Sequence, residues 1–337
     1  METTLMLGPD RKLDEVLAAF HTLFGDFERG YAEIRLLDPE KVEPAIIKWF
    51  PLSSGTAEMD VIEFVSPYEG KRNAYIGRAP RSREGSDEAA IDFVTSISFD
   101  VDPIRPKNSP STVQEFRAAE HAALRIAEAS EVGELVHSGN GTQVWVPLKS
   151  PVDIRGRRDW WKEAHRRFEE AALRRAGAFS VVQVDNQFDI PRLVCLPGFL
   201  KVKGEEDYAA GRLYRPAQFA DRVGPSRHMD PERILAMAPS ESEPAMRRIV
   251  SGPALPVPAR FWRVLNDDPR LYEAYNGERR DLADPSNSTQ NMALVNRLRH
   301  HGFSRDEASA ILQAAPSLKA RANSYYLDLT LRKVYGA

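Results

Sequence analysis

The amino-acid sequence predicts a mixed α/β fold of the α+β type, followed by a smaller all-helical domain. Short runs rich in β-branched and aromatic residues recur between Tyr31 and Gly204, as is typical of strands. Segments with a helical spacing of apolar residues separate these runs. From Arg260 onward the pattern is helical. We therefore expect a sheet in the first part of the chain and a helical domain at its end.

The expected elements follow in order along the first part of the chain. A helix is expected at 10–25, and strands are expected at 31–37, 59–65, 73–80 and 93–102. The later elements are a helix from Ser111 or Thr112, a hairpin at 134–148, a helix at 159–175, a strand at 181–185 and a strand–turn–strand unit at 193–204.

A change of composition predicts the domain boundaries. Pro, Ser, Glu and Met become frequent after the last expected strand, as in a connection between domains. We expect a first domain at 1–223, a connection at 224–258 and a helical domain at 259–337. Within the helical domain, Ser304 and Glu307 have the spacing of a capping box.

Composition excludes several classes of protein and site. The chain has 337 residues, 42% apolar and 28% charged, which is ordinary for a globular protein. Its formal net charge of −3 neither supports nor excludes a nucleic-acid partner, because basic residues can gather in one groove. The single cysteine, Cys195, excludes an internal disulfide and a cysteine-rich zinc module. With no apolar run near ~18 residues and no signal-peptide pattern, we expect a cytoplasmic protein without a membrane partner.

Asp100 and Asp102 end the strand-like run at 93–102, in the segment SFDVDP. Alternate residues of a strand point to the same face, so both carboxylates project together about 6.5–7 Å apart. Hard oxygen ligands of this kind suit Mg²⁺ or Mn²⁺. The alternative is a solvated strand end that runs into a turn at Pro103. Ser96 and Ser98 precede the acids on the less apolar face, which favours a cleft.

Two further segments carry candidate ligands for phosphate. In SGNGTQVW (138–145), the glycines would let backbone N–H groups approach a phosphate, and Gln143 would donate to it. The alternative is a plain glycine-rich hairpin. In the segment 184–204, Asp185 is a third acid, and Lys201 and Lys203 would share a strand face. The alternative there is an edge strand protected by lysines.

In this combination and order, the three segments resemble the motifs of the archaeo-eukaryotic primase (AEP) superfamily, in particular its plasmid, phage and mobile-element primase-polymerases. The resemblance covers about Tyr31 to Gly204. It implies an AEP catalytic core with an RRM-like, mixed or antiparallel sheet in 1–223. It also implies that Asp100, Asp102 and Asp185 are the catalytic acids and metal ligands. The residues implied in nucleotide binding are Ser138, Gly139, Gly141, Gln143, Arg192, Lys201, Lys203, Arg78 and Arg81.

The sequence departs from the family pattern at two positions. Gln143 stands where the second motif usually has a histidine, and Cys195 stands where the third motif usually has a second arginine. Glutamine offers a neutral N–H donor, whereas histidine can carry a positive charge. His137 or Lys149 are the candidates to compensate for this lost charge.

The resemblance implies a DNA primase-polymerase that joins NTPs or dNTPs on a single-stranded DNA template with Mg²⁺ or Mn²⁺ and no zinc. The basic segment 155–175 is a candidate template surface, or else a solvated polar face. Any replicative helicase is expected in a separate protein or in another part of a longer chain, since the sequence has no G-x-x-x-x-G-K-[ST] loop. The alternatives are a metal-dependent nuclease and a non-catalytic DNA-binding module for replication initiation.

Overall fold

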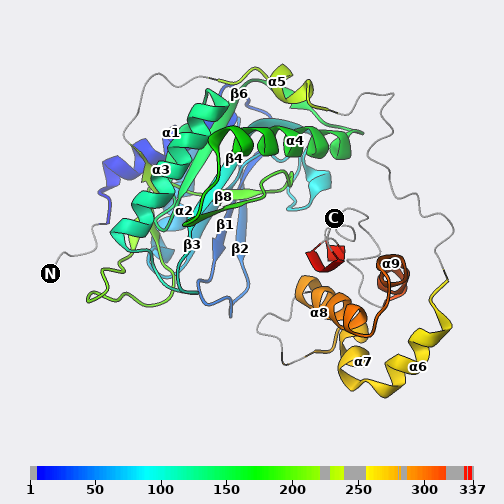
Figure 1. Ribbon diagram of the computed structural model, residues 1–337. Coiled ribbons are helices and arrows are strands. Elements are labelled where there is room, and N and C mark those ends of the chain that lie inside the picture. The colour runs from blue at the N-terminus through cyan, green and yellow to red at the C-terminus, as the bar shows by residue number, and fades with distance from the viewer. Residues whose placement is uncertain are drawn as a thin grey trace. The chain divides into compact units, whose positions relative to one another are not determined.

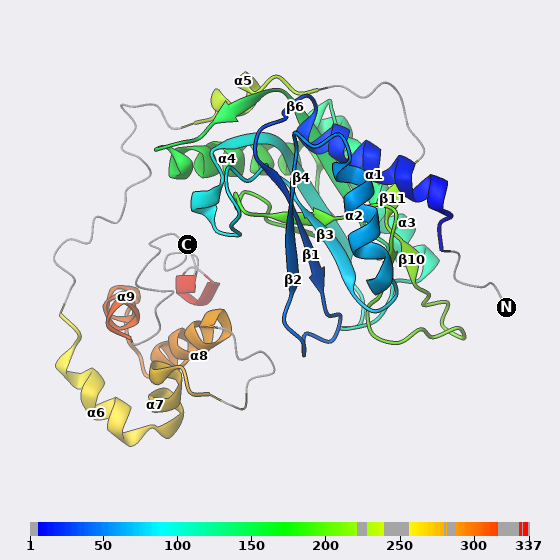
Figure 2. The same ribbon diagram turned by 180° about the vertical axis from the view of Figure 1, so that it is seen from behind.

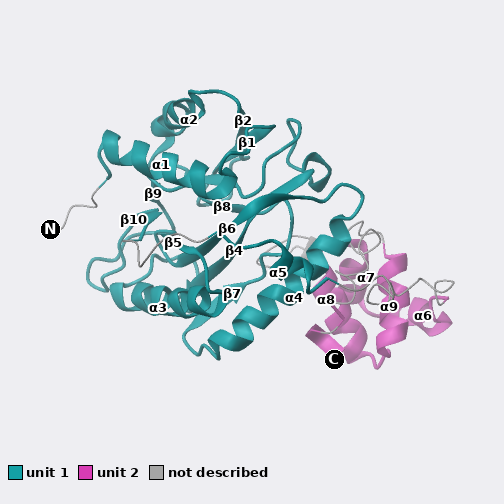
Figure 3. Ribbon diagram, turned by 90° about the horizontal axis from the view of Figure 1, so that it is seen from above, with its two compact units in different colours: residues 1–240 teal, residues 241–337 magenta. Residues whose placement is uncertain are grey.

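The computed structural model of the chain describes residues 6–220, 228–238, 256–279, 281, 287–315, 330–331 and 333–335. It divides into two compact units, Met1–Ser240 and Glu241–Ala337 (Figure 3). None of the helices in this described part of the chain is long and apolar enough to cross a bilayer.

Part of the expected connection at 224–258 belongs to the first unit. Residues 228–238 pack on it, and Met229 and Ile234 are buried in its core. Met229 also forms a bridge with Leu148. Residues 224–227 and 239–255 of the expected connection lie outside the described residues.

The first unit contains two antiparallel sheets and a short strand pair. Its helices and strands are α1 (Pro9–Phe24), β1 (Tyr31–Leu37), β2 (Ile46–Pro51), α2 (Ala57–Val65), η1 (Ser66–Tyr68), β3 (Asn73–Gly77), η2 (Glu88–Ala90), β4 (Phe93–Pro103), α3 (Val113–Ser130), β5 (Glu134–His137), β6 (Thr142–Asp153), α4 (Arg158–Ala176), β7 (Val182–Asp185), β8 (Leu193–Cys195), β9 (Leu200–Lys201), β10 (Arg215–Pro216), β11 (Gln218–Phe219) and α5 (Glu232–Leu235). The strand orders are β2-β1-β3-β8, β11-β5-β6-β4-β7 and β10-β9. The expected antiparallel α/β fold is therefore confirmed.

Helices cover the two larger sheets. Figure 1 shows α3 and α4 in front of the five-stranded sheet, and Figure 2 shows α1 and α2 on the opposite side of the unit, with the four-stranded sheet. Strand β4 explains the first layer: Ile97, Phe99 and Val101 are fully buried in the core that α3 and α4 share. The side chains that alternate with them, from Ser96 to Asp102, leave the other face of the strand.

One expected strand is a helix. Residues 59–65 belong to α2, where Ala57, Val61 and Val65 are buried at intervals of four residues and so lie on one helical face. The β-branched residues of 59–65 suggested a strand, but the helical spacing of the buried residues determines that the segment folds as a helix. Strand β2 was not expected, because Phe50 is its one fully buried position and its hydrophobic alternation is weak.

The second unit is helical, as expected for 259–337. Its helices are α6 (Ala259–Asp267), α7 (Pro269–Asn276), α8 (Asn287–His300) and α9 (Arg305–Ala314). The predicted capping box is present, since Ser304 Oγ accepts from the Glu307 backbone N–H and Glu307 accepts from that of Ser304. The last expected helix lies mostly outside the described residues.

Asp268 begins α7 and ties it to α8. Its Oδ1 accepts from the backbone N–H groups of Arg270 (3.0 Å) and Leu271 (3.2 Å), and its Oδ2 accepts from Arg297 Nε (2.5 Å) and pairs with His301 Nε2 (2.7 Å). We expect Asp268→Ala to lower the free energy of unfolding of this unit by about 1–2 kcal/mol, the usual cost of a lost N-cap. Urea titration followed by circular dichroism measures this loss. Asp268→Asn keeps the capping oxygen and should lose less, and equal losses would contradict the capping role.

Candidate active site

Three carboxylates lie on one face of the five-stranded sheet, at the end of β4. Asp100 pairs in register with Asp185 of β7 on one side and with Gln143 of β6 on the other. Residues directly opposite each other on antiparallel strands point to the same face. Asp102 lies two residues further along β4 and shares that face. Asp100 and Asp185, far apart in the sequence, are thus cross-strand neighbours.

This face turns toward the four-stranded sheet. Ser98, on the same face as Asp100, accepts a hydrogen bond from Arg78, which follows β3 (3.2 Å). Gln143 accepts hydrogen bonds from Cys195 of β8. Asp100 therefore lies on the face that turns toward the four-stranded sheet, away from the core that α3 and α4 fill, whereas Asp185 on the edge strand is exposed.

The three carboxylates repel one another. Burial, followed by the charges of Asp102 and Asp185, raises the pKa of Asp100 to about 7, while Gln143 and Arg192 act in the opposite direction. Among the described residues, no group of three His, Cys, Asp or Glu side chains converges as a metal-binding set. The carboxylates are neighbours on one face, and their oxygen atoms are of the type that Mg²⁺ and Mn²⁺ prefer. The chemistry of the donors fits a divalent cation that would relieve this repulsion.

Basic side chains border the acids. Arg105 Nη2 lies 3.5 Å from Asp102 Oδ1. Arg192, whose charge acts on Asp100, donates from Nε to Gln187 Oε1 (3.1 Å). Burial and the nearby Arg105 lower the pKa of Lys203, and the Asp102 charge partly offsets this. The site therefore places positive charge next to the carboxylates.

Lys201 contacts an aromatic ring. Its Nζ lies 3.3 Å from the centroid of the Tyr75 ring. That Nζ is buried and has no hydrogen-bond partner within the described part of the chain. Strand β9 ends at Lys201, so Lys203 lies beyond it and the expected common strand face is not formed.

The glycine-rich hairpin joins β5 to β6, as expected. A Cβ on Gly139 would come within 2.5 Å of Lys201 Cβ, and one on Gly141 within 2.4 Å of the Val101 carbonyl oxygen. The Gly141 N–H donates to Ser138 Oγ (3.1 Å), and the Ser138 N–H donates to the Gly141 oxygen (2.9 Å). The glycines thus allow close packing beside Asp102, and the Gly141 N–H is not free for a phosphate.

The two residues that depart from the motif pattern contact each other. Gln143 Oε1 accepts from the backbone N–H of Cys195 (3.3 Å) and from its Sγ (3.1 Å). Trp145 Nε1 donates to the same oxygen (3.0 Å). Any contact of Gln143 with a phosphate would have to come from its amide nitrogen.

Arg78 and Arg81 are buried. Arg78 donates to Ser98 and to the backbone oxygens of Gln187 (2.7 Å) and Asp189 (2.9 Å), so it holds the loop that follows Asp185. Arg81 is fully buried and donates to Glu33 (2.6 Å). Both arginines thus have internal acceptors, and their role in nucleotide binding stays a prediction.

Neither candidate to replace the motif histidine lies beside Gln143. His137 Nε2 pairs with Glu120 of α3 (2.9 Å), on the opposite face of the sheet from Gln143. Lys149 is exposed, six residues further along β6. The prediction that His137 or Lys149 compensates for the charge lost at Gln143 is therefore wrong.

Glu169 was not singled out from the sequence. It is buried in α4 and accepts the Gln187 backbone N–H (3.2 Å), which supports the loop between Asp185 and Arg192. Its position beside Phe168, within the apolar stripe of the helix, was the signal in the sequence that could have indicated its burial. Burial raises the pKa of Glu169 to about 7, while Gln187 and the charges of Arg78 and Arg192 act against this shift.

The pKa of Glu169 predicts a pH-dependent stability. The folded chain binds this proton more tightly than the unfolded chain, so the carboxyl costs nothing below about pH 4.5 and its full cost appears above about pH 7. We expect the stability of Glu169→Gln relative to wild type to rise by roughly 3 kcal/mol between pH 4.5 and pH 8. Urea unfolding at both pH values measures this change, and a constant difference would contradict the assignment.

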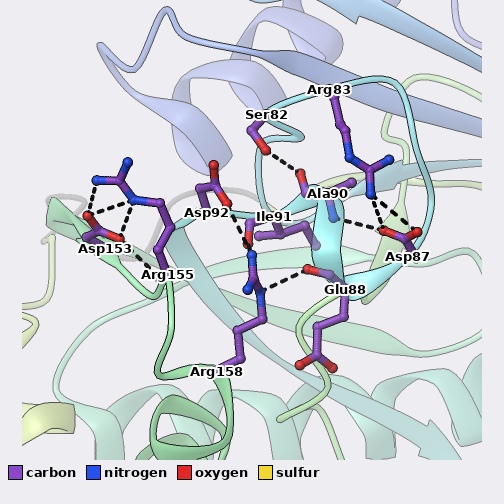
Figure 4. Close-up of polar contacts among 10 residues, drawn as sticks. All are labelled: Ser82, Arg83, Asp87, Glu88, Ala90, Ile91, Asp92, Asp153, Arg155 and Arg158. Carbon is purple, nitrogen blue, oxygen red and sulfur yellow. Dashed lines mark hydrogen bonds and ion pairs between the residues drawn. The ribbon is translucent and has the colours of Figure 1, made fainter.

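The basic residues of the segment 155–175 are largely paired with acids. Figure 4 shows Arg155 against Asp153, and Arg158 against Asp92. Further pairs along α4 are Lys162 with Glu88 and Asp159, Arg166 with Glu163 and Glu170, Arg167 with Glu163, and Arg174 with Glu170. This pairing favours a solvated polar face over a template surface.

No protein-family model matches the chain, and no curated protein matches it. Over most of its length, the chain is structurally similar to solved primases and primase-polymerases. One is the AEP domain of the cyanophage S-2L primase-polymerase, with 18% identity, a TM-score of 0.38, and coverage of 67% of this chain and 97% of that chain. Another is the primase RepB′, with 14% identity, a TM-score of 0.41, and coverage of 97% of this chain and 95% of that chain. These similarities concern the fold alone.

Proposed function

We propose that the chain is a DNA primase-polymerase, a nucleotidyltransferase that joins NTPs or dNTPs on a single-stranded DNA template. The observation that supports this most is the register that sets Asp185 beside Asp100, with Asp102 on the same face. Basic side chains lie close enough to Asp100 and Asp102 for their charges to interact. Carboxylates that hold cations next to positive charges for a triphosphate are what this reaction needs.

In the proposed reaction, a 3′-hydroxyl oxygen attacks the α-phosphorus of the incoming nucleotide. A new P–O bond forms, the bond to pyrophosphate breaks, and the hydroxyl proton is released to solvent. When bound, two Mg²⁺ or Mn²⁺ ions would activate the attacking oxygen and stabilise the leaving one. Asp100, Asp102 and Asp185 would hold these ions. The positive charge of the ions would offset the negative charge of the carboxylates and the triphosphate.

Basic residues would bind the triphosphate. Lys201 has a buried ammonium group that lies over the Tyr75 ring and has no hydrogen-bond partner among the described residues, so a phosphate oxygen would supply its missing acceptor. Arg192 and Lys203 lie close enough to the acids for their charges to act on them. Gly139 packs against Lys201 and would keep the hairpin backbone beside the phosphates.

A product-length assay tests the proposal. The full chain is incubated with single-stranded and primed DNA templates, labelled NTPs or dNTPs, and Mg²⁺ or Mn²⁺. We expect new primers or longer primers. Shortened DNA would identify a metal-dependent nuclease instead. DNA binding without any change in length would favour the non-catalytic replication-initiation module, and either result would overturn the proposal.

A further inference from the structure

We propose that Trp145 and Cys195 are positioning residues that hold the Gln143 amide with its nitrogen toward Asp100. The inference rests on the proposed function, because it gives these residues a part in presenting Asp100 to a divalent cation. It makes Gln143 a support for the metal-binding acids rather than a ligand for phosphate.

The contacts of Gln143 fix which way its amide points. Three donors converge on Oε1: the indole N–H of Trp145 (3.0 Å), and the backbone N–H (3.3 Å) and Sγ (3.1 Å) of Cys195. Gln143, Trp145 and Cys195 are all buried, with exposed fractions of 5%, 0% and 1%. A flipped amide would place its own donors against these donors and leave buried N–H groups without an acceptor. The network therefore specifies a single orientation.

The nitrogen of that amide faces the first acid. Gln143 and Asp100 are directly opposite each other on β6 and β4, so their side chains leave the same face of the sheet as close neighbours. The Gln143 side chain lowers the pKa of the Asp100 carboxyl, as a neighbouring amide N–H donor does. Hydrogen-bonded partners of a metal-binding carboxylate fix its orientation and contribute to metal affinity.

The donors come from both sheets. Trp145 lies two residues beyond Gln143 on β6, on the same face, whereas Cys195 belongs to β8 of the four-stranded sheet and pairs with Tyr75. Burial raises the pKa of Cys195 to about 12, so its thiol remains a neutral donor. Gln143 is therefore a point at which the contact between the two sheets determines the geometry at Asp100.

Mn²⁺ affinity, measured on the full chain by isothermal titration calorimetry, tests the inference without an activity readout. Loss of an outer partner of a metal ligand costs about 10–100-fold in affinity. We expect about a tenfold rise in the Mn²⁺ dissociation constant for Gln143→Leu. The double variant Trp145→Phe/Cys195→Ala leaves Gln143 in place but removes two of the three donors to its Oε1, and we expect a rise of about threefold to tenfold. Cys195→Ser keeps a side-chain donor and should bind like wild type.

Gln114→Leu is the matched control. Gln114 is exposed on α3, which covers the other face of the sheet from the acids, so the same substitution there should leave Mn²⁺ affinity unchanged. Thermal unfolding checks each variant, and Trp145→Phe alone, which removes one N–H, replaces the double variant if that one does not fold. Wild-type Mn²⁺ affinity in the folded Trp145→Phe and double variants would overturn this inference and leave the proposed function intact. If the wild-type protein does not bind Mn²⁺, or if its Mn²⁺ affinity does not depend on Asp100 and Asp102, the proposed function is overturned as well.

Discussion

Asp102→Ala is expected to reduce nucleotide incorporation by about 10³-fold or more under saturating Mg²⁺ or Mn²⁺. The substitution removes one of the three proposed metal ligands, and metal ions contribute several kcal/mol of charge stabilisation to the transition state. Each ~1.4 kcal/mol corresponds to a factor of ten in rate. Single-turnover extension of a labelled primer measures the loss.

Asp189→Ala is the matched control for this prediction. Asp189 lies in the loop between Asp185 and Arg192, its side chain is exposed, and its backbone oxygen rather than its carboxylate binds Arg78. We expect this variant to retain most of the activity. Binding of a labelled single strand should change little in both variants. Full activity in Asp102→Ala would refute the three-acid site.

Glu33→Ala is expected to lower the free energy of unfolding of the first unit by about 3–5 kcal/mol, as is usual when one partner of a buried ion pair is removed. Glu33 is fully buried and accepts from Arg81 Nε (2.6 Å) and Ser86 Oγ (2.6 Å), and it also pairs with Arg35. Without it, the buried guanidinium of Arg81 would lose its ion-pair partner. Equilibrium unfolding in urea measures the change.

The surface pair of Asp153 and Arg155 gives the comparison. Their side chains are exposed and interact only at the surface (Figure 4). Exposed ion pairs contribute little to stability, so Asp153→Ala should leave the unfolding midpoint close to that of wild type. If both substitutions cost the same, the buried position of Glu33 would not explain its effect.

Local patterns in the sequence predicted much of the fold around the acids. The alternation of Ile97 and Phe99 with Ser98 identified the buried and polar faces of β4, because strand periodicity does not depend on the partner strand. The hairpin at 134–148 and the helix that starts after Thr112 also appear as expected, since each depends on a few adjacent residues.

Such local patterns do not specify which distant residues come into contact. That Asp185 lies opposite Asp100 depends on β7 pairing with β4, which no local signal specifies. The burial of Arg78 and Arg81 follows from acceptors on distant segments, Gln187 and Glu33. The contact between Gln143 and Cys195 likewise joins two different sheets. Each of these features depends on tertiary packing, and together they determine the chemistry of the site.

The register of Asp100 with Asp185 also bears on the cohesion of the sheet itself. Strand β7 has four residues and lies at the edge, and like charges directly opposite each other weaken strand pairing. A divalent ion between these carboxylates would replace their repulsion with a shared attraction to the ion. The pairing of β7 with β4 should therefore become more stable as the cation concentration rises. Slower hydrogen exchange of the β7 amides with added Mn²⁺ or Mg²⁺ is the expected signature. The site and the edge of its own sheet would then order together.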